Sequence, residues 1–273
     1  MVKFVVLQVL CACLAFSASA QGTAQDVLRQ ISDRAPDVIF LGEIHDNPTH
    51  HRNQHEIALT LAPSALVFEM ITAESAGDVT TTLAQGGLDG LRAMLDWDNS
   101  GWPDFEFYAP LFEMAADAAI YGAWVDRDSA RAAFDLGAAQ AFDGDAARFG
   151  LDQPLPPEEQ ATREAEQMAA HCDALPADIL PAFVEAQRLR DAELAARVLE
   201  ALDTVGGPVL VITGNGHARL DIGAARLLRF AAPTVSVFSL GQTEDGRVPD
   251  AALYDAWLSA TAPERGDPCA VFR

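Results

Sequence analysis

Runs of apolar residues alternate along the chain with longer stretches of mixed polarity. Five of these runs read as strands buried on both faces of a sheet. They are residues 38–41, 65–71, 120–128, 208–213 and 234–240, and a further run, 269–272, is interpreted as a short edge strand. Strands separated by helices favour right-handed crossovers and parallel pairing. The pattern predicts an α/β fold with a mainly parallel sheet flanked by helices.

Two long stretches between the strands, 74–94 and 157–202, have helical residue spacing. The first is interrupted by a glycine pair and the second by prolines. We expect the second to form two or three helices that stand off the sheet as a helical cap subdomain. The chain from residue 21 to 273 is therefore interpreted as one α/β domain with helical insertions. These insertions cover about residues 74–118 and 140–203.

The first 20 residues have the anatomy of a signal peptide. Lys3 is followed by an apolar segment, and Ala18-Ser-Ala20 provides a small-residue cleavage site. The alternative is a lipoprotein signal in which Cys13 is lipidated after cleavage. Both interpretations predict an exported, periplasmic protein that is soluble or attached to a membrane only through a lipid anchor.

The net charge of the chain limits which partners are expected, and its cysteines limit which disulfides can form. The chain has 18 basic and 40 acidic residues and a formal net charge of −22. Such acidity disfavours binding to nucleic acid, so no nucleic-acid partner is expected. Beyond the leader only Cys172 and Cys269 remain. In an exported protein they can form a disulfide, and the alternative is two separate buried thiols.

Two of the predicted strands are followed by the same pattern, Gly-x-x-His and then a helix. The first copy is Gly42 to His45 and the second is Gly214 to His217. Strand-to-helix turns of a parallel sheet all lie at its carboxyl edge. The two copies are therefore expected to face one crevice, although they are far apart in the sequence.

Carboxylates accompany these histidines. Glu43 lies inside the first Gly-x-x-His copy, and Glu69 is the only ionisable residue in its apolar run. A lone carboxylate in a buried strand needs a partner, which could be a metal, an imidazole or a neighbouring turn. We predict a catalytic cluster of Glu43, His45, Glu69 and His217. A divalent metal would be held by His45, Glu43, His217 and His51, since imidazole and carboxylate are suitable ligands.

Other familiar motifs are absent. The chain has no P-loop and no Gly-x-Ser-x-Gly elbow, and Arg219 stands where a dinucleotide-binding turn needs a small residue. Residues 96–110 are rich in aromatic side chains and are interpreted as a loop that lines a ligand pocket. The alternative is a small hydrophobic core beneath a long loop.

Several of these motifs resemble those of the ChaN family of haem-binding proteins associated with iron uptake. This family is part of a wider group with Tiki/TraB and erythromycin-esterase-like proteins. The resemblance covers about residues 37–269. It is carried by Leu41–Gln54, Phe68–Met70, Tyr108-x-Pro110, His171-Cys172, Ala186–Leu194 and Gly214–Arg219.

The resemblance implies a haem-binding protein in which two protomers, a homodimer, enclose a pair of haems. It also implies a tyrosine ligand for the iron, and Tyr108 is the first choice because it lies in a shared motif. His171 and Met168 are other candidates, although His171 also suits a helix-capping or buried role. The haem propionates would be bound by an arginine. Arg127, Arg188 and Arg190 are the candidates.

Two functions from different classes follow. The favoured hypothesis is a haem-binding protein for uptake or storage of haem or iron. The alternative is a hydrolase of a peptide, ester or lactone that uses the Gly-x-x-His and glutamate cluster. Its water would be activated by histidine as general base, or by a bound divalent metal.

Overall fold

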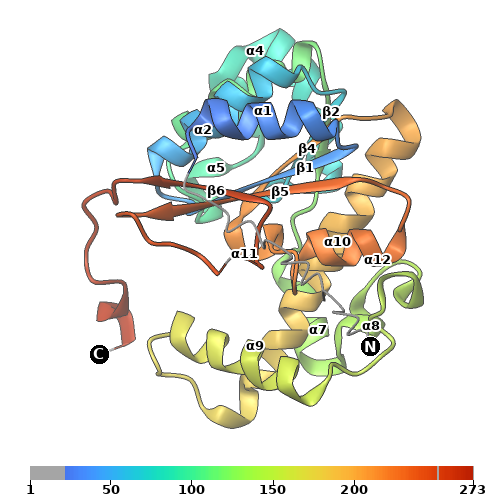
Figure 1. Cartoon of the computed structure of the whole chain (residues 1–273), viewed down its shortest axis with the longest axis vertical. Helices are drawn as coiled ribbons and strands as arrows, with labels where there is room; N and C mark the ends of the chain where they lie inside the picture. Colours follow the sequence, from blue (N-terminus) through green and yellow to red (C-terminus); the bar gives the residue numbers. More distant parts are fainter. Residues whose placement is uncertain (1–21, 251, 273) are drawn as a thin grey trace, which may run out of the picture.

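The computed structural model describes residues 22–250 and 252–272 (Figure 1). Within them, six parallel strands form one sheet in the order β3-β2-β4-β1-β5-β6. The strands are β1 Val38–Glu43, β2 Ala65–Phe68, β3 Ala119–Gly122, β4 Val209–Gly214, β5 Val237–Glu244 and β6 Ala256–Ala260. The predicted α/β fold with a parallel sheet is therefore confirmed.

Helices cover both faces of this sheet. The α-helices are α1 Ala24–Arg34, α2 Pro48–Leu61, α3 Ala73–Ala76, α4 Val79–Met94, α5 Trp97–Ser100, α6 Phe105–Phe112, α7 Arg127–Leu136, α8 Ala138–Ala141, α9 Pro157–Ala170, α10 Leu180–Val205, α11 Asn215–Ala218 and α12 Ala224–Ala231. Short 3₁₀ segments are η1 Glu113–Ala116, η2 Ala146–Phe149, η3 Ala177–Ile179 and η4 Pro268–Phe272. In Figure 1, α1 and α2 lie on one side of the sheet and α10 and α12 on the other.

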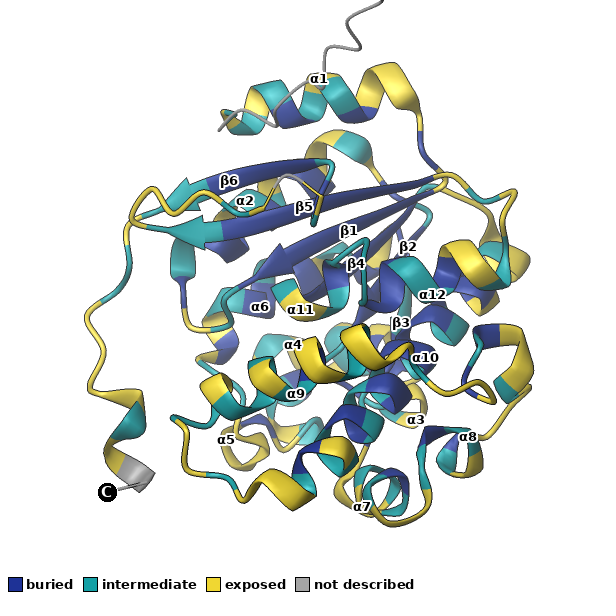
Figure 2. Ribbon diagram, turned by 60° about the horizontal axis from the view of Figure 1, so that its bottom comes forward, coloured by how far each residue is buried: buried dark blue, intermediate teal, exposed yellow. Residues whose placement is uncertain are grey.

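The sheet separates two hydrophobic cores. Ile39 and Leu41 of β1 pack in the core with α1, α2 and α6. Val38 and Phe40 of the same strand pack in the core with α10 and α12. Successive side chains of a strand point to opposite faces, so a strand covered on both sides must be apolar throughout. Figure 2 shows the central strands as buried along their length.

Local sequence signals explain where several elements begin and end. The Asn47 side chain accepts the backbone N–H of Thr49 and Pro48 occupies the first turn, so α2 starts where the sequence predicts. β3 ends at Gly122, earlier than expected, and α7 begins at Arg127. The Asp126 carboxylate caps that helix by accepting the backbone N–H of Ser129.

Two expectations are corrected. Residues 96–110 are not a loop but contain α5 and most of α6, and Trp97 and Phe105 are buried in the core. This matches the alternative of a local hydrophobic core. The C-terminal residues 269–272 belong to the 3₁₀ segment η4, and the edge strand is β6 instead. Pairing of β6 with β5 occupies the edge that the C-terminal run would have joined.

The 157–202 region divides into two helices with different roles. α10 packs directly on β2, β3 and β4, with Leu194 and Val198 in the core. α9 packs against α10. The break lies near Pro176 and Pro181, as the sequence indicates. α10 therefore belongs to the central layers, and α9 extends the helical layer beyond the carboxyl edge of the sheet.

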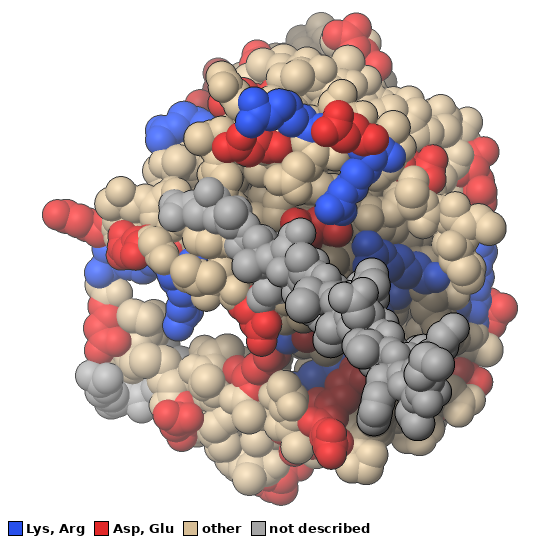
Figure 3. Space-filling model, viewed as in Figure 1, with Lys and Arg blue, Asp and Glu red and all other residues tan. Residues whose placement is uncertain are grey.

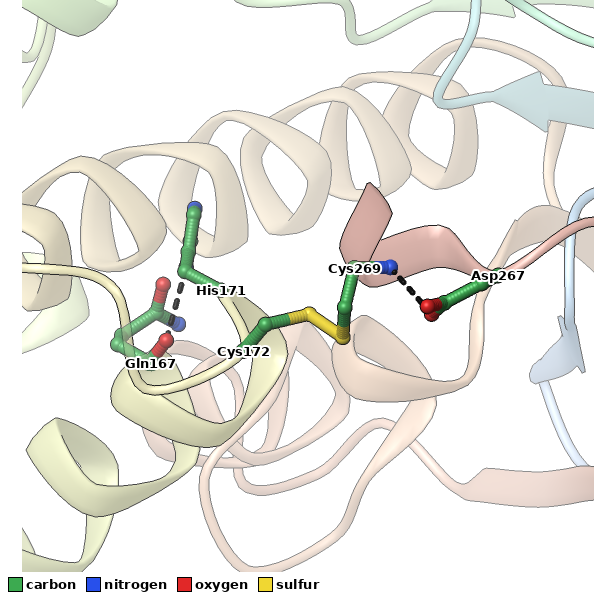
Figure 4. The surroundings of a disulfide bond; sticks show 5 residues. All are labelled: Gln167, His171, Cys172, Asp267 and Cys269. Carbon is green, nitrogen blue, oxygen red and sulfur yellow. Dashed lines mark hydrogen bonds between the residues drawn. A yellow bond between two sulfur atoms is a disulfide. The ribbon is translucent and has the colours of Figure 1, made fainter. Parts of the chain in front are cut away.

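A disulfide joins Cys172, just after α9, to Cys269, which is one of the two alternatives that the sequence left open (Figure 4). It ties the C-terminal segment, residues 261–272, to the turn between α9 and α10. The predicted signal peptide and Cys13 lie outside the described residues. Within the described residues, no helix combines the length and apolar character needed to cross a membrane.

Replacing Cys269 with Ser should lower the free energy of unfolding by on the order of 2–5 kcal/mol. The reason is that the disulfide joins residues 97 apart in sequence and so restricts the unfolded chain. Urea unfolding of the wild type and the variant measures the difference. Unfolding of the wild type in a thiol reductant is the matched control and should give the same value. Equal stability of oxidised and reduced wild type would contradict the prediction.

Candidate functional site

The two Gly-x-x-His turns lie side by side at the carboxyl edge of the sheet. β1 and β4 are neighbouring strands, and their register pairs Gly42 with Thr213 and Glu43 with Gly214. The loop after β1 carries His45, and α11 directly after β4 carries His217. The geometric expectation that distant segments meet at one edge is therefore confirmed.

Glu43 and His45 form one unit. The buried Glu43 carboxylate accepts Nδ1–H of His45 at 2.7 Å on Oε1. The same oxygen accepts the Tyr108 hydroxyl at 2.5 Å, and Oε2 accepts the Gln54 amide at 2.6 Å. The His45 side chain is 36% exposed. The unit is thus a fixed carboxylate that orients an accessible imidazole.

Histidines of α2 hold the loop that carries His45. Nε2–H of the buried His51 donates to the His45 carbonyl oxygen at 2.7 Å. His50 accepts the Ile44 backbone N–H at 2.9 Å and lies 3.2 Å from the Thr243 carbonyl oxygen. The position of the His45 ring is therefore set by its own hydrogen bond to Glu43 and by the backbone on both sides.

A second unit contains Glu69, His217 and Asp191. Oε2 of Glu69 accepts the Thr213 hydroxyl at 2.6 Å and the Gly214 backbone N–H at 2.7 Å. Nδ1–H of His217 donates to Asp191 at 2.7 Å, and its Nε2 lies 3.5 Å from Glu69. His217 is therefore held between two carboxylates.

Asp191 is a member of the site for which sequence reasoning assigned no role. It lies in the middle of α10 and is buried. The sequence pointed to Asp191 only through the family resemblance, because this residue lies in one of the motifs that resemble the ChaN family. A buried carboxylate on the face of a core helix requires a partner, and His217 is that partner.

Protonation of the histidine is favoured in both units. Burial opposes ionisation of His45, but its hydrogen bond to Glu43 and the charge of Glu69 raise the pKa of His45 above its ordinary value. Burial opposes ionisation of His217, but Glu69 and Asp191 outweigh it and raise the pKa of His217 to about 9. Burial likewise works against ionised Glu69, yet His217 and His45 hold the pKa of Glu69 below its ordinary value. At neutral pH His217 is therefore an imidazolium between two carboxylates.

A cavity of about 410 Å³ opens beside both units. Its wall includes His45, His217 and Asp191, together with Arg163 of α9 and Val184 of α10. The space-filling view shows an opening bounded on one side by the C-terminal segment (Figure 3). The predicted crevice therefore exists, and helices α9 and α10 form the wall opposite the sheet edge.

Aromatic side chains flank His45. The Trp102 ring lies edge-on to the His45 ring at 4.9 Å between centroids. Trp124 in turn contacts Trp102 at 5.2 Å, and both tryptophans are partly exposed. An apolar surface therefore adjoins an accessible imidazole.

Tyr108 and His171 lie in different surroundings. Tyr108 is fully buried, and burial together with the charge of Glu43 raises the pKa of its phenol well above the ordinary value. Its place is beneath the site, where it positions Glu43. His171 is half-buried at the end of α9, where its Nδ1 donates to the Gln167 carbonyl (Figure 4). Its ring also contacts Phe183.

The arginines expected near a propionate differ in availability. Arg188 is buried, and its guanidinium binds Glu185 and the carbonyl oxygens of residues 150, 151 and 153. Arg190 is half-buried and feels the charges of Glu69 and Asp191. Within the described residues, Arg190 has no hydrogen bond or salt bridge. Arg188 thus stabilises the fold, whereas Arg190 lies near Glu69 and Asp191, outside the lining of the cavity.

The divalent-metal set predicted from the sequence, His45, Glu43, His217 and His51, is not supported. Among residues 22–250 and 252–272, no group of three or more His, Cys, Asp or Glu side chains is arranged to hold a metal ion. Glu43 is engaged by its donors, and His51 donates to a backbone carbonyl. The side chains gather at one edge, but as two separate imidazole–carboxylate units.

Comparison with known proteins places this arrangement in a family. The geometry defines a class of protein, namely a parallel α/β fold with two Gly-x-x-His turns at the same edge of the sheet. The model of the haem-binding uptake family, Tiki superfamily, ChaN, matches residues 28–228. The chain belongs to this family. Among curated proteins, no sequence matches it.

Solved structures share the fold. The ChaN protein of Campylobacter jejuni, described as binding haem cofacially, is similar with a TM-score of 0.65 and 18% identity. The similarity covers 85% of this chain and 90% of that one. A mutant erythromycin esterase, EreC, in its open conformation is more distant, with a TM-score of 0.42 and 10% identity over 84% and 77% of the two chains.

The stability of the protein should fall between pH 6.5 and about 9 because His217 loses its proton there. Its folded-state pKa lies above the ordinary value, so the stabilisation is fully present below pH 6.5 and is lost as the pH rises through about 9. The loss should be on the order of 3 kcal/mol. Urea unfolding across this window measures it.

His217→Gln should remove most of this pH dependence, whereas the matched control His55→Gln on α2 should keep it. The prediction fails if wild type and His217→Gln lose stability in parallel over the same window.

Proposed function

We propose that this protein is an exported haem-binding protein that acts in the uptake or storage of haem or iron. Membership of the ChaN family over residues 28–228 is the observation that carries the proposal. The likeness in fold to the Campylobacter jejuni protein, which binds haem cofacially, supports it. In this proposal haem is the ligand that the protein carries, and it would supply porphyrin-bound iron for uptake or storage.

The chemistry at the sheet edge suits such a ligand. Haem needs a donor for its iron, apolar surface for the porphyrin and a cation for its propionates. His45 lines the cavity, and the rings of Trp102 and Trp124 lie beside His45 outside the cavity lining. Arg190 also lies outside the lining, close enough to Glu69 and Asp191 to feel their charges. These groups support haem binding at the sheet edge, in a position that extends beyond the cavity itself.

Arg190 replaces Arg188 as the proposed partner of a propionate. A carboxylate that approached Arg188 would have to displace three backbone carbonyls and Glu185. Arg190 can accept an anion without breaking existing hydrogen bonds. Arg127, at the exposed start of α7, lies in a different environment and serves as a control.

Export is proposed from two features. Residues 1–20 have the composition of a signal peptide, with Cys13 as an alternative lipidation site. The Cys172–Cys269 disulfide suits an oxidising compartment such as the periplasm. We also propose a homodimer in which two protomers enclose a pair of haems, as cofacial binding in the related protein suggests.

Titration of the purified, oxidised protein with haemin should give a saturable change in the haem absorption spectrum. Size-exclusion chromatography should show a dimer once haem is bound. Arg190→Gln should weaken binding by roughly 10-fold, since a charge-assisted hydrogen bond contributes about 1.5–3 kcal/mol, whereas Arg127→Gln should bind as the wild type does. Absence of any spectral change in the wild type would refute haem binding.

A second candidate function is hydrolysis of an ester, peptide or lactone. It is favoured by one observation, the accessible His45 imidazole oriented by Glu43 beside the His217 imidazolium. His45 Nε2 would take a proton as a water oxygen bonds to the carbonyl carbon, and would then pass it to the departing oxygen or nitrogen. His217 would stabilise the negative charge on the carbonyl oxygen.

A panel of chromogenic esters, peptides and lactones tests this second function. Any turnover should fall by roughly 100-fold or more in His45→Ala and in His217→Gln, because each removes a group that acts in the transition state. His55→Gln should retain the wild-type rate. Turnover that survives both site variants would exclude catalysis by this cluster.

A further inference from the structure

The chemistry of the cavity differs from that of the aromatic surface beside it. Most of the described residues that line this space of about 410 Å³ are polar or charged, and none of them is Phe, Trp or Tyr. The rings of Trp102 and Trp124 lie outside the lining. Small-molecule sites commonly have volumes of about 300–1,000 Å³. The cavity is therefore large enough for a ligand of its own, and that ligand must be polar.

The cationic side chains of the lining already have partners of opposite charge. Arg163 is paired with Glu159 at 2.7 Å, and Arg219 is bound by two carboxylates at 2.7 and 2.8 Å. His217 is likewise held between two carboxylates. An ion that entered the cavity would lose its water and would have to compete with these pairs. The lining therefore favours an uncharged ligand that carries several polar groups.

One pair of charged groups is too far apart for a direct hydrogen bond. Nη1 of Arg163 lies 4.0 Å from Oδ2 of Asp191, and the two residues are only 6% and 4% exposed. Within the described part of the chain, neither of these atoms makes a hydrogen bond. A hydroxyl oxygen can lie about 2.8 Å from both, because it donates to a carboxylate and accepts from a guanidinium at once. The gap therefore matches a hydroxyl group of a ligand.

Two glutamines line the same space from different helices. Gln167 belongs to α9 and Gln187 to α10, and both are partly exposed. An amide donates and accepts, so each side chain can bind a further hydroxyl. Val184 and Ile222 contribute apolar surface to the same lining. Such a mixture suits a sugar ring, which has hydroxyl groups at its rim and C–H groups on its faces.

We propose that the cavity binds a neutral, hydroxyl-rich molecule with the chemistry of a monosaccharide or disaccharide, through Arg163, Asp191 and the two glutamines. The inference goes beyond the proposed haem function and does not depend on it, because the tryptophan rings and Arg190 lie outside the cavity. The carboxyl edge of the sheet thus carries two neighbouring sites of different character, an aromatic surface and a polar cavity.

Titration of the purified, oxidised protein with glucose, N-acetylglucosamine and sorbitol, followed by ligand-observed NMR, tests the proposal. At least one of these three neutral probes should bind saturably, with a Kd on the order of 1 mM, as expected for a ligand of this size. Citrate and inorganic phosphate should bind more weakly, because the cations of the lining are already paired.

Gln167→Leu and Gln187→Leu should each weaken binding of the neutral probe by roughly 3- to 10-fold, because each removes an amide at nearly constant volume. Arg163→Lys keeps a cation near Glu159 but loses Nη1, and it should weaken binding by roughly 10-fold. Gln160→Leu, on α9 outside the lining, is the matched control and should bind as the wild type does.

Haem titration of the same variants separates the two sites, since their haem spectra should equal that of the wild type. Altered haem spectra would contradict this separation. The inference is overturned if no neutral probe binds saturably, if citrate or phosphate binds more tightly, or if the double variant Gln167→Leu/Gln187→Leu and Arg163→Lys keep the wild-type affinity. A wild type that binds a neutral probe but no haem would refute the proposed function and support the polar site.

Discussion

The carboxylate of Glu43 is the constraint around which the site is built. A buried, ionised carboxylate is costly unless donors replace its water. Here the donors come from three elements, since His45 follows β1, Gln54 lies in α2 and Tyr108 in α6. Helices α2 and α6, which pack on the sheet through their apolar residues, therefore each present one polar group to the end of β1. Loss of the carboxylate would leave the buried Tyr108 hydroxyl without its acceptor.

The second unit contains the same kinds of group as the first, a histidine and carboxylates, but its imidazole lies in different surroundings. His45 has one carboxylate partner and an accessible ring, whereas His217 lies between Glu69 and Asp191 and is largely buried. Two close anions make the charged imidazolium the stable form, and this removes the lone pair that a metal or a substrate proton would need. Two copies of one sequence pattern therefore produce an accessible imidazole and a largely buried one, and neighbouring carboxylates raise the pKa of both.

The sequence predicted the parts of the fold that depend on local pattern. Apolar strands, the Asn47-Pro48 start of α2 and the meeting of both Gly-x-x-His turns follow from periodicity and from parallel topology. Other features depend on tertiary contacts that have no local signature. Asp191 is one carboxylate among many in helical stretches, and only the packing of α10 brings it to His217. The family resemblance makes Tyr108 the first choice for the iron ligand, because it lies in a shared motif. In the structure, however, α6 buries Tyr108 beneath Glu43.

The C-terminal segment, residues 261–272, links elements that lie on different sides of the cavity. Arg265 binds Asp46, next to His45, and also Glu244 at the end of β5. Four residues later Cys269 is bonded to Cys172 after α9. The loop that carries His45 and the helix that forms the opposite wall are therefore joined through one short stretch of chain. The disulfide therefore ties this stretch covalently to the turn that follows α9, the helix whose Arg163 and Gln167 line the cavity.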